Sequence, residues 1–256
     1  MQSDYALRYR VLYQRHWWWR ARERWILRAL SRWRPPGGWP SVLDVGCGDG
    51  LFFDQLVALG ANVEGVERDA SLVSPDGAHR QKITIAPFDE RFQPGKRYSL
   101  ILLLDVLEHM EDPVAALQHA VNLLEADGRV IATVPAFMIL WTSHDVINRH
   151  FTRYTRRTFD ELAQSAGLQV DVARYFFHWT FPVKLAAHFA QRASTQKVVV
   201  PAVPSRWLNG SLHALSVFEQ CTLGRLRLPF GSSLLIVGQR ASPLDSESKR
   251  KSVQQS

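Results

Sequence analysis

Three glycines within five residues follow a short apolar run, and this loop carries the first chemical signal of the chain. The stretch from Ser41 to Gly50 reads Ser-Val-Leu-Asp-Val-Gly-Cys-Gly-Asp-Gly, and a helical pattern opens at Leu51. Such a pattern predicts a strand, a tight turn and a helix. Glycine lets a ligand approach the main chain closely, and helix-start amides attract polar groups. A ligand-binding loop and a plain tight turn both remain open at this point.

An acidic residue at the end of the second predicted strand favours the interpretation of this loop as a ligand-binding loop. Glu67 lies 21 residues after Gly46 and directly follows the strand pattern of residues 62–66. An acidic residue about 20 positions past a glycine loop is placed to bind the two hydroxyls of a ribose. The spacing therefore predicts a nucleoside-containing cofactor.

A second polar cluster follows the fifth predicted strand, at the edge where the ligand is expected. Its members are Trp141, His144, Asp145, His150, Arg153 and Tyr154. We expect His144 or His150 to act as a general base, with Asp145 orienting it. Trp141, Arg153 and Tyr154 are the expected acceptor contacts. The alternative is a loop whose histidines and arginine bond only to backbone.

No metal site is expected in this cluster. His144, Asp145 and His150 are metal-ligand types, but their spacing matches no common metal motif.

Strand and helix patterns alternate around these residues. The predicted strands span residues 41–45, 62–66, 82–86, 98–104, 129–134, 168–175 and 233–239. Helices are predicted at 52–59, from Pro113 to about 125, and from Thr155 to Gly167, and Asp127-Gly128 is read as a turn. Alternation of this kind, with a continuously apolar fourth strand, predicts an α/β fold: a doubly wound, mostly parallel, seven-stranded sheet.

The first 38 residues form a separate basic and aromatic segment. Residues 4–34 have helical spacing and end at Pro35-Pro36-Gly37-Gly38. Residues 1–34 hold nine arginines against two acids, which accounts for the whole net charge of +7, and five of the nine tryptophans. Three interpretations stay open: a helix packed on the main domain, a lid over the ligand, or a peripheral membrane contact through residues 8–34.

The remaining chain reads as one domain, residues 39–240, with an insertion and a tail. Residues 176–231 interrupt the pattern before the last strand, with helices near 183–192 and 206–225 and a proline-marked break at Pro201 and Pro204. These helices are expected to pack on the N-terminal helix and to cover the ligand-binding site. Residues 241–256 are rich in Ser, Lys, Arg and Gln, which predicts disorder.

Composition narrows the functional classes. Cys47 and Cys221 cannot build a disulfide framework, which indicates a reducing compartment. Charged residues interrupt every apolar run short of membrane-spanning length, and the arginine-rich N-terminus does not resemble a signal peptide. We therefore expect a cytoplasmic protein, whose expected membrane contact, if it has one, is peripheral association with the inner membrane face. A charge confined to one helix makes nucleic acid an unexpected partner.

Four motifs together resemble the class I S-adenosylmethionine-dependent methyltransferases. They are Asp44 to Gly50, Glu67, Asp89 and the segment Leu104-Asp105-Val106-Leu107-Glu108-His109-Met110, in that family's order and spacing. The family's loop, Asp-x-Gly-x-Gly-x-Gly, differs from the dinucleotide pattern Gly-x-Gly-x-x-Gly, and this chain has the former. One departure is Ser99, where the family commonly has aspartate.

The resemblance implies a Rossmann-like methyltransferase fold, S-adenosyl-L-methionine as cofactor and S-adenosyl-L-homocysteine as product. It assigns the methionine end of the cofactor to the backbone at Gly46 and Gly48, the ribose to Glu67, and the adenine to Phe88 and Asp89. The implied cofactor-binding set is Asp44, Gly46, Cys47, Gly48, Glu67, Arg68, Phe88, Asp89, Leu104 and Asp105.

The N-terminal His16-Trp17-Trp18-Trp19 segment also resembles a bacterial subgroup whose chains begin with a His-Trp-Trp helix. The sequence thus predicts a methyltransferase acting on a small hydrophobic or aromatic acceptor, or on a lipid-linked one, at oxygen. The alternatives are a nucleic-acid methyltransferase, an NAD-dependent oxidoreductase and a non-catalytic cofactor-binding module. The loop spacing disfavours the oxidoreductase, and the missing Asn-Pro-Pro-Tyr or Asp-Pro-Pro-Tyr motif disfavours the nucleic-acid enzyme.

Overall fold

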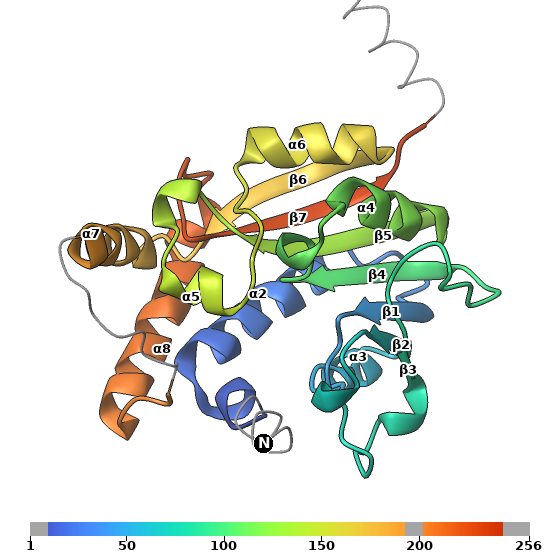
Figure 1. The fold of residues 1–256 in the computed structure, drawn as a ribbon, viewed down its shortest axis with the longest axis horizontal. Helices are drawn as coiled ribbons and strands as arrows, with labels where there is room; N and C mark the ends of the chain where they lie inside the picture. The colour runs from blue at the N-terminus through green and yellow to red at the C-terminus, as the bar shows by residue number, and fades with distance from the viewer. Residues whose placement is uncertain (1–9, 193–201, 243–256) are drawn as a thin grey trace, which may run out of the picture.

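A seven-stranded sheet forms the centre of the computed structural model, which describes residues 10–192 and 202–242. The spatial order is β3-β2-β1-β4-β5-β7-β6 (Figure 1). The strands are β1 (Ser41–Val45), β2 (Asn62–Glu67), β3 (Ile83–Ile85), β4 (Tyr98–Leu104), β5 (Leu124–Pro135), β6 (Leu168–Phe176) and β7 (Ser233–Arg240). β7 is antiparallel to β5 and β6, and the other pairs are parallel. The predicted doubly wound, mostly parallel sheet is confirmed.

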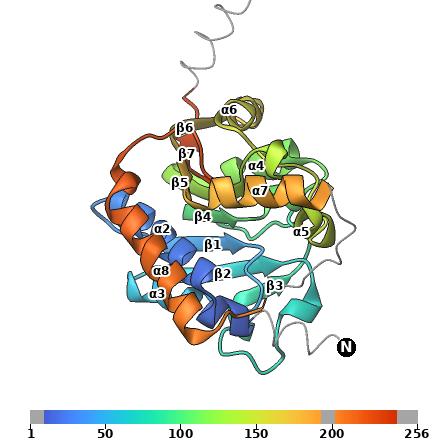
Figure 2. The same cartoon turned by 90° about the vertical axis from the view of Figure 1, so that its left-hand side faces the viewer.

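Helices cover both faces of this sheet (Figures 1 and 2). They are α2 (Trp17–Arg32), α3 (Phe53–Ala58), α4 (Pro113–Asn122), α5 (Ser143–Ile147), α6 (Arg156–Ser165), α7 (Thr180–Arg192) and α8 (Arg206–Cys221). On one face, α4 and α6 bury Leu117 and Phe159 completely. On the other, α2 and α3 bury Leu30 and Phe53. Each helix thus contributes one apolar stripe to a core, which is the main source of stability for such a layered fold.

Two predicted boundaries next to the fifth strand were wrong, and one of them is the end of the helix from Pro113, which lies at Asn122 and not near residue 125. Asp127-Gly128 is not a turn before the fifth strand but lies within β5, which begins at Leu124. The register between β4 and β5 shifts from the pair Tyr98–Leu124 to the pair Leu100–Arg129. A bulge of this kind accommodates extra residues without ending the strand, so a turn-like dipeptide can sit inside it.

The N-terminal helix is divided at His16. Residues 10–15 are helical, His16 is extended (φ −75°, ψ 134°), and its ring Nδ1 accepts a hydrogen bond from the Trp18 amide. This is an N-cap, which starts α2 as a new helix. The one long helix predicted from the spacing is therefore two, because a residue inside the helical pattern serves as a cap.

The insertion before β7 forms the two expected helices, but they dock in different places. α8 packs along α2, where the Asn209 side chain accepts from the Trp17 amide (2.8 Å) and Gln220 donates to the Ala21 carbonyl (2.8 Å). α7 packs instead against the short turn η4 (Met138–Leu140) beyond β5. Only α8 follows the prediction that the inserted helices pack on the N-terminal one.

In the described part of the chain, no helix is both long and apolar enough to cross a membrane. Three predictions fall at least partly outside the described residues: the helical start at residues 4–9, the break at Pro201 and most of the tail, residues 243–256.

Candidate active site

The glycine loop leaves β1 with its main chain exposed to one side. Gly46 (φ +68°) and Gly48 (φ +54°) have left-handed backbones, which side chains other than glycine rarely adopt. A Cβ on Gly46 would lie 2.8 Å from Val106 Cγ2, whereas a Cβ on Gly48 would meet no atom within 4 Å. A side chain at position 46 would thus clash with Val106, yet the Gly46 main chain itself is exposed, whereas Gly48 is buried and its amide is bonded to Glu67.

Glu67 holds this loop from the end of β2. Its carboxylate accepts hydrogen bonds from the amides of Gly48 and Asp69, both at 2.9 Å. The side chain is buried, at 6 % exposure. Each oxygen retains a further acceptor position, which suits the diol of a ribose. Arg68, also predicted to bind cofactor, is exposed beside it.

Asp44 and Cys47 flank the loop from within the protein. Burial raises the pKa of the Asp44 carboxyl to about 7. Burial likewise raises the pKa of the Cys47 thiol, which packs so closely that a Cβ on Gly65 would lie 2.3 Å from its Sγ. Cys47 is therefore a protonated, packed side chain in this structure.

Phe88 and Asp89, the predicted adenine contacts, follow β3. Phe88 is buried against the rings of Phe92 (centroids 5.9 Å apart) and His119 (4.9 Å). Asp89 accepts two hydrogen bonds from Arg91 Nε (3.0 and 3.1 Å), and these bonds lower the pKa of its carboxyl to about 2. Its charge is therefore already matched by a neighbouring arginine.

Asp105 occupies the end of β4 with a left-handed backbone (φ +58°), next to half-buried Leu104. Its carboxylate pairs with Arg22 Nε at 2.6 Å and accepts from the Thr133 hydroxyl at 3.1 Å. Arg22 comes from α2 and is itself buried. The N-terminal helix therefore delivers a cation to the strand edge where the resemblance places the sulfonium, a contact that the sequence did not predict.

Asp145 is the centre of the polar cluster beyond β5. It is fully buried and accepts hydrogen bonds from His150 Nδ1 (2.8 Å), from Arg153 Nε and Nη2 (2.8 and 2.9 Å) and from the Thr142 amide (2.8 Å). Burial alone would raise the pKa of this carboxyl, but the bonds from His150 and Arg153 hold it well below its usual range. The carboxylate is therefore ionised and acts only as an acceptor.

The two predicted histidines differ in their surroundings. Because Asp145 can only accept, His150 must donate from Nδ1, so Nε2 is the nitrogen that carries the lone pair in a neutral ring. The side chain of His144 has no hydrogen-bond partner in the described chain, and burial lowers the pKa of its imidazole. Asp145 and His150 thus form the predicted oriented pair, and His144 stands outside it.

The three predicted acceptor contacts also separate. Trp141 is half-buried on the turn before α5. Arg153 and Tyr154 are buried, and their donors are engaged: Arg153 with Asp145 and the Ala136 carbonyl (3.2 Å), and Tyr154 with the Leu107 carbonyl (3.2 Å). The donor groups of Arg153 and Tyr154 are therefore bonded to the protein itself and not directed at the acceptor. Both residues support the site without facing the ligand.

Glu108 and His109 join this site although the sequence interpretation left them out. Glu108 is 1 % exposed, and its Oε2 has no hydrogen-bond partner within the described residues. Burial, then the charge of Asp105, raises the pKa of its carboxyl well above the usual range. The His109 ring meets His150 edge-on, with centroids 4.6 Å apart. In the sequence, the one indication that Glu108 and His109 belong to the site was their position shortly after the apolar fourth strand.

The same residues could hold a metal ion. Glu108, His109 and His150 place one ligand atom each within 4.8 Å of one another. A carboxylate and two imidazoles are common ligands of zinc and iron. This possible metal set shares only His150 with His144, Asp145 and His150, the three residues that were considered as metal ligands from the sequence.

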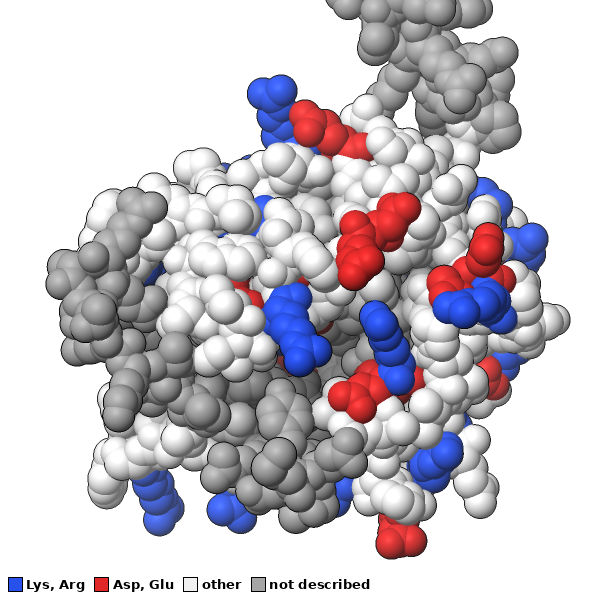
Figure 3. Space-filling view, in the orientation of Figure 1, with Lys and Arg blue, Asp and Glu red and all other residues white. Residues whose placement is uncertain are grey.

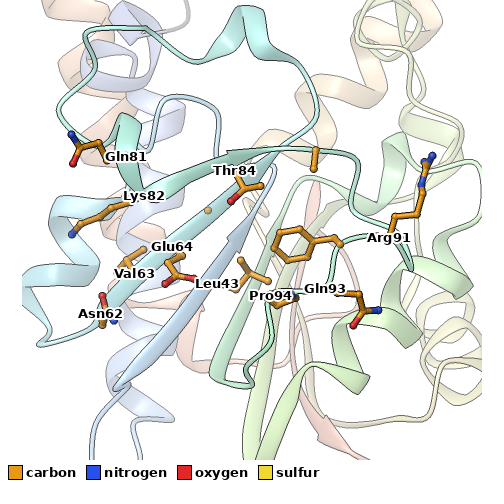
Figure 4. A pocket seen from close by; sticks show the side chains of 13 residues that line it. Leu43, Asn62, Val63, Glu64, Gln81, Lys82, Thr84, Arg91, Gln93 and Pro94 are labelled. Atoms are coloured by element: carbon orange, nitrogen blue, oxygen red, sulfur yellow. The ribbon is translucent and has the colours of Figure 1, made fainter.

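A separate cavity of about 570 Å³ lies over β2 and β3 (Figure 4). Its walls include Val63, Glu64, Thr84 and Pro94. None of the predicted cofactor, acceptor or catalytic residues lines it, so it is distinct from the site described above.

Charges are mixed on the face shown in Figure 3, where Lys and Arg side chains stand beside Asp and Glu side chains. A nucleic-acid surface would gather basic residues into a stripe or patch. The described part of this face has no such patch.

Comparisons with known proteins agree with the resemblance. A family model described as "Methyltransferase domain" matches residues 13–172. A ubiquinone biosynthesis O-methyltransferase of Glaesserella parasuis serovar 5 (strain SH0165) is 31% identical over 115 residues, which cover 39% of this chain and 49% of that protein. The chain thus spans about half the length of the curated relatives it matches.

Solved structures share the fold over most of the chain. The complex between the Haloferax volcanii Trm112 methyltransferase activator and the putative methyltransferase matches with a TM-score of 0.59 and 19% identity, covering 93% of this chain and 95% of that one. A SAM dependent methyltransferase from Archaeoglobus fulgidus matches with a TM-score of 0.54 and 15% identity, covering 85% and 94%. At these identities the likeness bears on the fold alone.

Proposed function

Because the chain belongs to the methyltransferase domain family, whose cofactor is S-adenosylmethionine, we propose that it methylates an oxygen atom of a small hydrophobic or aromatic acceptor. The observation that carries the proposal is the hydrogen bond from His150 Nδ1 to Asp145, 2.8 Å long, beside the ends of β4 and β5. It leaves an imidazole nitrogen free to take a proton from a hydroxyl group.

The loop residues suit the cofactor. The exposed backbone at Gly46 would hold its methionine end, and the remaining acceptor positions of Glu67 would hold the ribose hydroxyls. When bound, S-adenosylmethionine supplies an activated methyl group. The chain's own contribution is to hold and orient the acceptor and to accept its proton.

His150 is our candidate general base, and Asp145 orients it. Asp145 fixes the proton on Nδ1 and would stabilise the imidazolium that forms when Nε2 accepts a proton. Arg153, bonded to both oxygens of Asp145, keeps that carboxylate ionised and in place. His144, with no such orienting partner, is the weaker candidate.

The N-terminal helix acts as a lid in this proposal. Arg10 pairs with Asp49 of the glycine loop, and Arg22 pairs with Asp105 at the end of β4. Two contacts on either side of the expected cofactor favour a lid over a helix that merely packs. The capping by His16 and the contact of Trp18 with Phe177 give the His-Trp-Trp segment a structural role. From the resemblance of this segment, we propose that the chain belongs to that bacterial subgroup.

A lipid-linked acceptor is the second candidate, because large apolar side chains are exposed beside the site. They are Met138, Ile139, Val146, Ile147 and Phe151, each at least half exposed. Arg20, Arg24 and Arg28 are exposed on α2 and could meet anionic headgroups. Salt-sensitive sedimentation with anionic vesicles, lost when these three arginines become glutamine, would support membrane contact. A protein left in the supernatant would refute it.

The central test is to incubate the protein with methyl-labelled S-adenosylmethionine and fractionated cell extract. We expect label in the small-molecule fraction, on an oxygen identified by NMR of the purified product. Label in the lipid fraction would favour the second candidate. Label in nucleic acid, or tight NADH binding in place of the cofactor, would overturn the proposal, and binding without transfer to any fraction would indicate a non-catalytic module.

A further inference from the structure

Three side chains of metal-binding type meet where the turn η3 (Leu107–His109), shortly beyond β4, contacts the loop after α5. Glu108 and His109 lie in η3, and His150 lies in that loop. The Phe151 amide donates to the Glu108 carbonyl (2.7 Å), and this bond fixes the two segments against each other. The fold thus brings one carboxyl group and two imidazoles together from segments that are far apart in the sequence.

The ligand atoms of this set are close enough for one ion. One atom of each side chain lies within 4.8 Å of the other two, and the two imidazole rings meet edge-on. Zinc holds nitrogen and oxygen ligands at about 2.0–2.2 Å. A single ion between the three side chains would therefore contact all of them after small side-chain rotations.

Glu108 provides a second, independent observation. The residue is 1 % exposed, and its Oε2 has no hydrogen-bond partner among the described residues. A buried polar atom without a partner is costly, whether the carboxyl group is ionised or protonated. An unpartnered oxygen beside two imidazoles indicates that a further group belongs at this point.

His150 is held in the way that is typical of a metal ligand. Its Nδ1 donates to the buried Asp145 carboxylate (2.8 Å), and Arg153 holds that carboxylate through two bonds of 2.8 and 2.9 Å. A histidine that binds a metal through one nitrogen almost always donates from the other to a carboxylate, a carbonyl or water. The pair with Asp145 therefore leaves Nε2 as the nitrogen that can bind an ion.

We propose that Glu108, His109 and His150 bind one divalent transition-metal ion of the zinc or iron(II) class. Two imidazoles with one carboxylate favour these ions over magnesium and calcium, which prefer oxygen ligands. Three protein ligands also leave a coordination position open, as in catalytic metal sites. The inference goes beyond the proposed function, which includes no metal ion.

Metal binding changes the part that His150 plays in the proposed function, because Nε2 cannot both bind an ion and accept a proton. In the metal-loaded chain, the hydroxyl oxygen of the acceptor would take the open position, and coordination would favour loss of its proton to water. The oxyanion then takes the methyl group from the sulfonium, whose sulfur keeps the bonding electron pair in S-adenosylhomocysteine. This step rests on the proposed function, whereas the metal binding itself does not.

The test measures metal binding directly, in the full chain after dialysis against EDTA. Cobalt(II) is the probe, because it has the same ligand preferences as these ions and its visible spectrum reports the bound ligands. Calorimetry gives the affinity and the number of ions bound. The variants are Glu108→Gln and His150→Gln. The matched controls are Glu111→Gln, at an exposed position three residues from Glu108, and His144→Gln, which changes a neighbouring histidine outside the set.

We expect the unmodified chain to bind one cobalt(II) ion without a thiolate charge-transfer band. Glu108→Gln and His150→Gln should each weaken binding by roughly 100-fold or more, because loss of an outer-shell partner alone costs about 10- to 100-fold. Both controls should bind the ion as the unmodified chain does. Unchanged S-adenosylhomocysteine affinity in each variant shows that the chain is folded.

Three results would overturn the inference. They are no saturable binding of cobalt(II) or zinc(II), binding that stays at full strength in Glu108→Gln or His150→Gln, and a thiolate band, which would move the ion to Cys47 or Cys221. Methyl transfer to the extract is measured separately. A chain that transfers methyl groups but binds no ion contradicts this inference alone, and a chain that binds the ion but transfers none contradicts only the proposed function.

Discussion

Asp145 is the residue on which the acceptor side of the site depends. It is fully buried and accepts from His150, from Arg153 and from the Thr142 amide. In Asp145→Asn the amide NH₂ would face the Arg153 guanidinium, leaving a buried charge without its partner. We expect a loss of about 3–5 kcal/mol in the free energy of unfolding, measured by urea denaturation. Asp76→Asn, at an exposed position, should change it by less than about 0.5 kcal/mol, and equal effects of the two substitutions would contradict the assignment.

The catalytic prediction separates the two histidines. His150→Ala removes the oriented imidazole, so we expect turnover to fall roughly 100-fold or more while cofactor affinity stays near that of the unmodified chain. His144→Ala should have a much smaller effect, because that ring has no orienting partner. Single-turnover kinetics with a saturating acceptor provide the measurement. Full activity of His150→Ala would leave a mechanism based on orientation alone.

The cofactor prediction concerns Glu67. Its carboxylate fixes the loop amide of Gly48 and, in our proposal, would also accept from the ribose hydroxyls, so Glu67→Ala should remove two functions at once. We expect S-adenosylhomocysteine affinity to fall by roughly 10- to 150-fold, the usual effect of losing a hydrogen bond to a charged group. Calorimetry measures this, with Glu90→Ala as an exposed control. If both variants bind equally well, Glu67 has no part in cofactor binding.

At the residue scale, prediction from sequence succeeded where partners are close along the chain. Asp145 and His150 are five positions apart on one turn and its following loop, so their pairing could be anticipated. The pairing of Arg22 with Asp105 could not be anticipated, because it depends on how α2 docks on the sheet. That docking arises from packing between distant segments, which local spacing does not record.

At the element scale, α2 supplies a testable packing contribution. Trp25 is 5 % exposed and lies between α2 and the core, with its ring centroid 5.6 Å from that of Phe176. Trp25→Ala should lower the free energy of unfolding by about 3–5 kcal/mol, because it leaves a cavity in the core. Trp207→Ala on α8 is the matched control, since Trp207 is 87 % exposed and should cost less than about 0.5 kcal/mol. Similar melting temperatures for the two variants would mean that α2 is not an integral part of the fold.

Prediction of whole elements depended on how strong their periodic pattern is. The apolar run of β4 and the start of the capped helix α4 at Pro113 have clear patterns and were placed correctly, although α4 ends at Asn122 and not near residue 125. The limits of β5 and the break at His16 were not placed correctly. The bulge in β5 contains residues that are also typical of turns, and the capping histidine lies within a helical pattern. The type of each element could thus be predicted from the local sequence. Bulges and caps could not, because they depend on contacts with segments that only the folded structure brings together.

At the scale of the whole molecule, stability should depend on pH through Asp44. Burial raises the pKa of this carboxyl from 3.8 to about 7. Between these values the folded chain holds a proton that the unfolded chain has released. The stability that this proton provides is therefore present below pH about 4 and lost as pH rises through about 7.

Asp44→Asn is neutral at every pH and should remove this dependence. We expect the difference in free energy of unfolding between the variant and the unmodified chain to shift by up to about 4 kcal/mol in the variant's favour between pH 4 and 8. Using the difference cancels the opposite contributions of the histidines whose pKa is lowered. Urea denaturation at three pH values measures it, and a difference that stays constant would show that Asp44 keeps an ordinary pKa.

The docking of α2 on α8 determines when the protein can mature during its synthesis. The Trp17 amide and Asn209 are 192 positions apart, and Ala21 and Gln220 are 199 apart. The ribosome releases the N-terminal helix long before its docking partner, so α2 has no complete packing surface until α8 (Arg206–Cys221) has emerged. Arg22 lies on the same helix, and its pairing with Asp105 is completed at that late stage. A nascent chain that ends before residue 206 would carry the glycine loop and Glu67 but lack α8, the helix on which α2 docks, so the complete packing of α2 forms only after α8 has been synthesised.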